Sequence, residues 1–141
     1  MRSPDLLGAV GIGVSDLVRS TDFYSRVIGM TQTQTFKVAY MDEVVLAFEG
    51  RTAVVLMHYT DGSVRNYKDN PVKLVFYVTD PKAVSDRIKA DGLEIVREPE
   101  AMDALGGAVV GLAKDPDGYI IELIQRPPVK AGAGAVVAVS P

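Results

Sequence analysis

A repeated aspartate-to-glycine spacing is the feature that most constrains how this chain folds. Asp16 follows an apolar run and Gly29 comes 13 residues later, while Asp80 follows a second apolar run and Gly92 comes 12 residues later. Aspartate caps the free N–H groups of a first helical turn, and glycine is common just past a helix end. Because a repeat decides the whole architecture, the spacing predicts two strand-then-helix units, 64 residues apart.

Alternating apolar residues predict the strands around these helices. Residues 7–14 place Val10, Ile12 and Val14 on one face and Ala9, Gly11 and Gly13 on the other. Further strands are predicted at 31–40, 43–49, 52–60, 73–78, 94–97 (ended by Pro99), 106–114 and 119–125. The sequence therefore predicts an α+β fold with a single domain at 1–126, made of βαβββ modules at about 7–60 and 73–126, a linker at 61–72 and a tail at 127–141.

Composition narrows the classes of function. The chain has no cysteine, which excludes disulfides, thiolate catalysis and cysteine metal sites. Its net charge of −3 provides no basic surplus for nucleic acid. No apolar run reaches the roughly 18 residues that a membrane helix needs, and residues 1–5 are not a signal peptide. We expect a cytoplasmic protein that binds neither nucleic acid nor membrane.

Two motifs in this β-α-β-β-β order carry a family resemblance. V-S-D-L-x-x-S-x-x-F-Y-x-x-V-I-G-M at 14–30 and D-P-D-G-Y-x-I-E-L at 115–123 resemble the vicinal oxygen chelate superfamily. That superfamily includes glyoxalase I, bleomycin- and fosfomycin-resistance proteins, methylmalonyl-CoA epimerase and extradiol dioxygenases. The resemblance covers residues 7–125. It implies mixed sheets that curl into a cleft, and a homodimer that completes two such clefts.

The resemblance also implies positions for a divalent metal. Glyoxalase-type members hold it with one residue from the first and one from the last strand of each module, and motif spacing places these at Ala9, Leu56, Lys73 and Glu122. Alanine and leucine offer no lone pair, and an ammonium has no acceptor. Because a metal needs several donor atoms at one point, we expect no metal and no other cofactor.

Lys73 and Glu122 are the polar members of this set. The strand order that the resemblance implies places them on neighbouring strands, where they would form an ion pair that replaces the metal as the polar centre of the cavity. An unpaired carboxylate on a face with Ile120 and Ile124 would be costly. By resemblance to glyoxalase and epimerase chemistry, Glu122 is a catalytic base candidate. The alternatives are a structural carboxylate for Glu122 and, for Lys73, a solvated charge rather than a contact to an anionic ligand.

Other side chains are weaker candidates. His58 is the only imidazole and the second catalytic candidate, with a hydrogen-bonded structural histidine as its alternative. Tyr77 is either a ligand-stacking group or a rim or core aromatic. Ala9 and Leu56 would leave room for the apolar part of a ligand.

Three functions follow from these residues. The main prediction is metal-independent binding of a small organic molecule in a dimer-completed cleft, as the resemblance to bleomycin-resistance proteins implies. The alternative is an enzyme, a glyoxalase-like lyase or isomerase or a dioxygenase-like oxidoreductase, which uses Glu122 as general base or metal ligand. A sensor or scaffold without chemistry is the third, so the sequence leaves open whether the protein is an enzyme.

Overall fold

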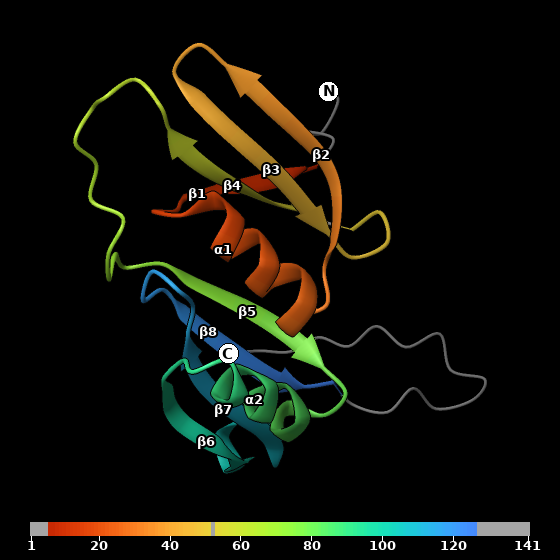
Figure 1. Cartoon of the computed structure of the whole chain (residues 1–141). Coiled ribbons are helices and arrows are strands. Elements are labelled where there is room, and N and C mark those ends of the chain that lie inside the picture. Colours follow the sequence, from red (N-terminus) through yellow and green to blue (C-terminus); the bar gives the residue numbers. More distant parts are fainter. Residues whose placement is uncertain (1–5, 52, 127–141) are drawn as a thin grey trace. The chain divides into compact units, whose positions relative to one another are not determined.

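The computed structural model describes residues 6–51 and 53–126 and contains the predicted duplication (Figure 1). The chain divides between Asn70 and Pro71 into two compact units. Unit 1 contains β1 (Ala9–Gly13), α1 (Leu17–Asp22), the π-helical η1 (Phe23–Val27), β2 (Thr31–Val38), β3 (Met41–Ala47) and β4 (Ala53–Tyr59). Unit 2 contains β5 (Lys73–Val78), α2 (Pro81–Ala90), β6 (Ile95–Met102), the 3₁₀ turn η2 (Asp103–Leu105), β7 (Ala108–Lys114) and β8 (Ile120–Gln125).

The two sheets have the same topology. Sheet A has the strand order β1-β4-β3-β2, and sheet B has the order β5-β8-β7-β6. In each sheet the first strand of the module pairs in parallel with the last, and the remaining pairs are antiparallel. The predicted α+β fold with two mixed sheets is therefore confirmed. This topology places the last strand of each module between two neighbours, inside the sheet.

Each helix covers one face of the sheet in its own unit (Figure 1). In unit 1 the buried side chains include Phe23, Tyr24 and Val27 from the helix and Ile12, Val14, Leu46 and Leu56 from the sheet side. In unit 2 they include Val84 and Ile88 from α2 and Phe76, Ile121 and Leu123 from sheet B. With ten residues α2 is the longest described helix, and no helix in the described ranges is long and apolar enough to cross a membrane.

Both helices begin at the predicted aspartates. The Asp16 carboxylate accepts a hydrogen bond from the Arg19 N–H at 3.0 Å. The Asp80 carboxylate accepts one from the Ala83 N–H at 3.1 Å, with Pro81 in the first turn. Each contact satisfies a helix N–H that has no partner within the helix. The caps therefore fix where each helix leaves the strand before it.

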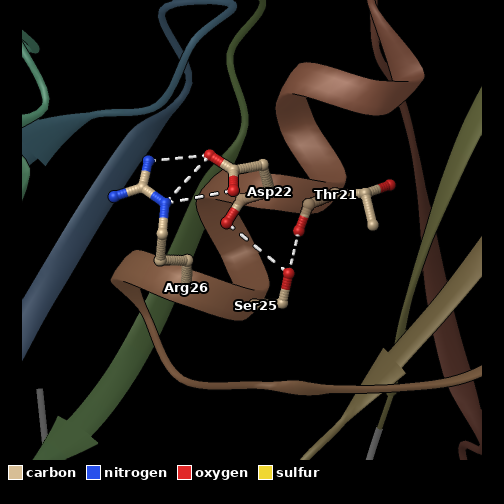
Figure 2. Close-up of polar contacts among 4 residues, drawn as sticks. All are labelled: Thr21, Asp22, Ser25 and Arg26. Carbon is tan, nitrogen blue, oxygen red and sulfur yellow. Dashed lines mark hydrogen bonds and ion pairs between the residues drawn. The ribbon is translucent and has the colours of Figure 1, made fainter.

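The helix of unit 1 changes from α to π geometry at Phe23, which the sequence did not predict. At this transition the Ser25 hydroxyl donates to the Thr21 carbonyl one turn back (Figure 2). The Arg26 guanidinium also binds the Asp22 carboxylate, with Nη2 2.7 Å from Oδ2. A serine that bonds back to the helix backbone loosens the regular hydrogen-bond pattern. The wider turn itself is closed by the Ile28 N–H, which donates to the Phe23 carbonyl at 3.1 Å.

The strand predicted to stop at Pro99 instead continues to Met102. It is β6, the edge strand of sheet B, and its pairing with β7 shifts register between Ile95 and Arg97 and again between Arg97 and Glu100. Proline has no N–H to donate, so it is tolerated in an edge strand or at an irregularity. Pro99 meets both conditions, so β6 continues through the proline.

The predicted linker folds back onto unit 1. Residues 61–70 contain no helix or strand. The Tyr67 hydroxyl accepts a hydrogen bond from the Tyr59 N–H at 3.1 Å, and its ring stacks on the His58 ring with centroids 5.5 Å apart. A Cβ added at Gly13 would lie 3.1 Å from the Tyr67 ring, so the glycine permits this close approach.

Candidate functional site

Sheet B has one face beneath α2 and an opposite face, which we call the far face of sheet B. Side chains alternate across a strand, and residues paired between strands share a face. The far face therefore carries Lys73, Val75 and Tyr77 of β5, which pair with Ile120, Glu122 and Ile124 of β8. The polar candidates predicted from this module thus belong to one surface of one sheet.

Glu122 lies at the centre of this face. Its strand, β8, lies between β5 and β7, and its register neighbours are Val75 and Leu112. Its side chain is only 16% exposed. A carboxylate held among apolar neighbours in this way needs a partner for its charge.

Lys73 is that partner, as the sequence predicted. Its Nζ donates to Oε1 of Glu122 at 3.0 Å, and its side chain is 55% exposed. A pair with this exposure contributes at most about 1 kcal/mol to stability. The main consequence is therefore local charge: a carboxylate and an ammonium side by side on an apolar surface. An ammonium has three donors, so it can hold this carboxylate and a ligand oxygen together.

Tyr77 lies further along the same face. It is two residues beyond Val75 on β5, pairs with Ile124, and is 55% exposed. An exposed aromatic ring offers apolar area with one polar end. The structure therefore places this predicted ligand contact on the surface that carries the ion pair, and its contact role stays a prediction.

The predicted position of Leu56 beside Ala9 is corrected by the structure. Leu56 pairs with Ile12 and is 0% exposed, so it belongs to the core face of sheet A on the α1 side. Ala9 is exposed on the opposite, far face of sheet A. The error is a shift of one residue, and in a strand such a shift moves a side chain to the other face.

Val55, and not Leu56, is the sheet A counterpart of Glu122. Val75 pairs with Glu122 in sheet B, and its repeat counterpart, Gly11, pairs with Val55 in sheet A. Ala9 then corresponds to Lys73. The far face of sheet A therefore has apolar side chains where sheet B has its ion pair.

His58 belongs to the α1 side of sheet A with Leu56, as its two-residue offset predicted. Its Nδ1 is 2.8 Å from the Val14 carbonyl oxygen, and its ring stacks on Tyr67. A carbonyl only accepts, so Nδ1 carries the proton in this contact. These contacts fit the hydrogen-bonded structural histidine that the sequence left as an alternative.

Arg65 of unit 1 lies outside the helices and strands, and its guanidinium is held by two contacts. Cζ of Arg65 is 3.7 Å from the centre of the Tyr59 ring, and its Nε donates to the Ser63 hydroxyl at 2.9 Å. Ser63 in turn donates to Asp61, and this hydrogen bond lowers the pKa of the Asp61 carboxyl. The guanidinium thus lies over the ring face, a position in which the ring attracts a cation.

Comparison with known proteins identifies the family. Residues 6–123 match the family described as Glyoxalase/Bleomycin resistance protein/Dioxygenase superfamily. The chain belongs to this superfamily. The resemblance inferred from the two motifs is thereby confirmed.

Curated members of the superfamily resemble the chain over most of its length. A probable lactoylglutathione lyase from Vibrio cholerae is 35% identical over 128 residues, covering 84% of this chain and 89% of that protein. A lactoylglutathione lyase from Escherichia coli is 31% identical, covering 86% and 93%. The findings thus support a glyoxalase-like family more than the bleomycin-resistance-like binding that was the main prediction.

Solved structures show the same fold. Glyoxalase I from Zea mays has a TM-score of 0.71 and 28% identity, and covers 86% of this chain. The chain spans 45% of the length of that enzyme. An antibiotic-binding protein from a Streptomyces species has a TM-score of 0.70 at 19% identity, covering 90% of this chain and 100% of that protein. This last likeness shows the fold alone.

The metal centre of glyoxalase-type superfamily members does not fit the residues of this chain. In unit 2 the Lys73 ammonium contacts the carboxylate of Glu122. In unit 1 the corresponding side chains are Ala9 and Val55, which have no donor atom. Among residues 6–51 and 53–126, no three His, Asp or Glu side chains form a group that could hold a metal ion.

Proposed function

We propose that this protein is a glyoxalase-like lyase or isomerase that moves a proton on a carbon beside a carbonyl group. The observation that carries this proposal is the Glu122 carboxylate at the centre of the far face of sheet B, held by the Lys73 ammonium at 3.0 Å. The lactoylglutathione lyases among its relatives support the same class of reaction. The proposed substrate is a small organic carbonyl compound.

In this proposal Glu122 is the base. Its Oε1 contacts Lys73, and its Oε2 takes the proton from the carbon beside the carbonyl. The C–H electron pair moves into the neighbouring C–C bond and the carbonyl oxygen becomes negative. Returned to the same carbon by the carboxylic acid, the proton restores the substrate with its hydrogen exchanged. Returned to the adjacent, former carbonyl carbon, it completes an isomerisation in which a hydroxyl on the first carbon gives its proton to the negative oxygen and becomes the new carbonyl group. Neither route needs an oxidant or reductant. A positioned base of this kind contributes about 10²–10⁴ in rate.

Binding without chemistry is the second candidate, favoured by one specific observation. The Glu122 charge is already matched by Lys73, and apolar Val75 and exposed Tyr77 share its face. A surface of this composition suits an organic ligand even if no proton moves. This candidate retains the metal-independent binding that the sequence predicted.

Proton exchange in heavy water separates the two candidates. The probe is S-lactoylglutathione, and proton NMR follows the C–H of its lactoyl group next to the thioester carbonyl. The proposal expects protein-dependent loss of this signal, together with shifts of Tyr77 and Glu122 resonances in labelled protein. Shifts without exchange would support binding alone and contradict the enzyme proposal. Neither shifts nor exchange would contradict both for this probe.

A further inference from the structure

We propose that the Lys73 ammonium takes the place of the divalent metal of glyoxalase-type relatives and supplies a fixed positive charge to an oxygen of the ligand. The inference rests on the proposed function, because it names the group that stabilises the negative oxygen formed when Glu122 removes a proton. It starts from a disagreement: the superfamily implies a metal, and the residues at its positions do not fit one.

An ammonium and a metal ion compete for the same carboxylate. Nζ of Lys73 is 3.0 Å from Oε1 of Glu122. A zinc ion bound to this carboxylate would lie about 2.0–2.2 Å from its oxygen. Two cations so close to one another repel strongly, because the Coulomb energy rises steeply at such distances. A metal ion at Oε1 would therefore compete with the Lys73 ammonium for the same oxygen.

The Lys73–Glu122 pair differs from an ordinary surface ion pair. Lys114 and Glu94 form another such pair in unit 2, with 3.3 Å between Nζ and Oε2, but Glu94 is 61% exposed. Glu122 is instead largely buried between Val75 and Leu112. Water screens its charge less, so the cation beside it has a stronger effect on any ligand that covers both.

The surroundings of the Lys73–Glu122 pair indicate the class of ligand. The Lys73 side chain is half exposed, so its ammonium meets solvent as well as Glu122. Tyr77 and Val75 offer apolar contacts on the same face. The matching ligand is a small organic molecule with an apolar part and an oxygen that carries or develops negative charge beside an acidic C–H bond. An ammonium holds such an oxygen as a point charge.

Zinc titration by calorimetry tests this inference without any assay of turnover. The wild-type protein is compared with Lys73→His, which replaces the ammonium by a zinc ligand next to Glu122. Lys114→His is the matched control, since it makes the same change in the other pair. We expect no measurable zinc binding in the wild type or the control, and weak but measurable binding in Lys73→His, where the histidine and Glu122 supply two ligands and water supplies the others.

Two outcomes would overturn the inference. Saturable zinc binding by the wild type that is lost in Glu122→Gln would show that Lys73 does not exclude a metal. A Lys73→His variant that binds zinc no better than Lys114→His would show that position 73 is not the metal position. Either result is independent of proton exchange, so failure of the proposed enzyme activity would be recognised separately, by the absence of exchange in the wild type.

Discussion

Replacing Glu122 by glutamine is expected to slow proton exchange in S-lactoylglutathione by about 10²–10⁴-fold. Glutamine has nearly the same shape as glutamate, and its amide oxygen still accepts a hydrogen bond from the Lys73 ammonium, but it cannot take a proton from carbon at neutral pH. The measurement is the rate of deuterium incorporation by NMR at matched protein concentrations. The probe should still bind, because the apolar contacts of the far face are unchanged.

Glu94→Gln is the control for this loss. Glu94 is also a glutamate paired with a lysine, Lys114, but it is exposed. Its substitution should leave the exchange rate within about twofold of wild type, since a solvated surface pair has little effect on a site it does not contact. Equal rates in Glu122→Gln and wild type would show that Glu122 is not the base.

Replacing Leu56 by alanine is expected to lower the free energy of unfolding by about 2–5 kcal/mol. The side chain is 0% exposed on the core face of sheet A, so truncation removes buried apolar area and leaves a cavity. Val55→Ala, one residue away on the opposite face, is the matched control, and its expected loss is about 1 kcal/mol or less. Urea unfolding followed by circular dichroism measures both.

The comparison tests the register of β4 directly. Similar losses in both variants, or a larger loss in Val55→Ala, would contradict the pairing of Leu56 with Ile12 and of Val55 with Gly11. The assignment of Val55 as the sheet A counterpart of Glu122 would then also fail.

Local chemistry allowed much of this fold to be predicted from sequence. Asp16 and Asp80 begin their helices as expected, because a cap depends on neighbouring residues only. The Lys73–Glu122 pair was predictable because the family resemblance implies that their two strands are adjacent. Strand alternation placed Val10, Ile12 and Val14 on one face, and Ile12 and Val14 are buried there while Val10 is 43% exposed.

The remaining features depend on contacts between elements. Leu56 was placed on the wrong face because register comes from pairing with β1 and β3, which no local pattern in Ala53–Tyr59 reveals. For the same reason the sequence did not identify Val55 as the sheet A counterpart of Glu122. It also did not identify Leu112 as a neighbour of Glu122. The strand through Pro99 depended on its position at a sheet edge, and the π-helical turn at Phe23 on packing and serine back-bonding that capping rules do not describe.

We propose that the far face of sheet B works through Glu122 and Lys73, without a metal. The most direct measurement is the exchange rate of S-lactoylglutathione for the wild-type protein before and after treatment with EDTA, with divalent metal content determined on the same samples. We expect equal exchange rates before and after the treatment, and far less than about one divalent ion per chain. Loss of exchange on chelation, restored by one divalent ion per chain, would contradict it.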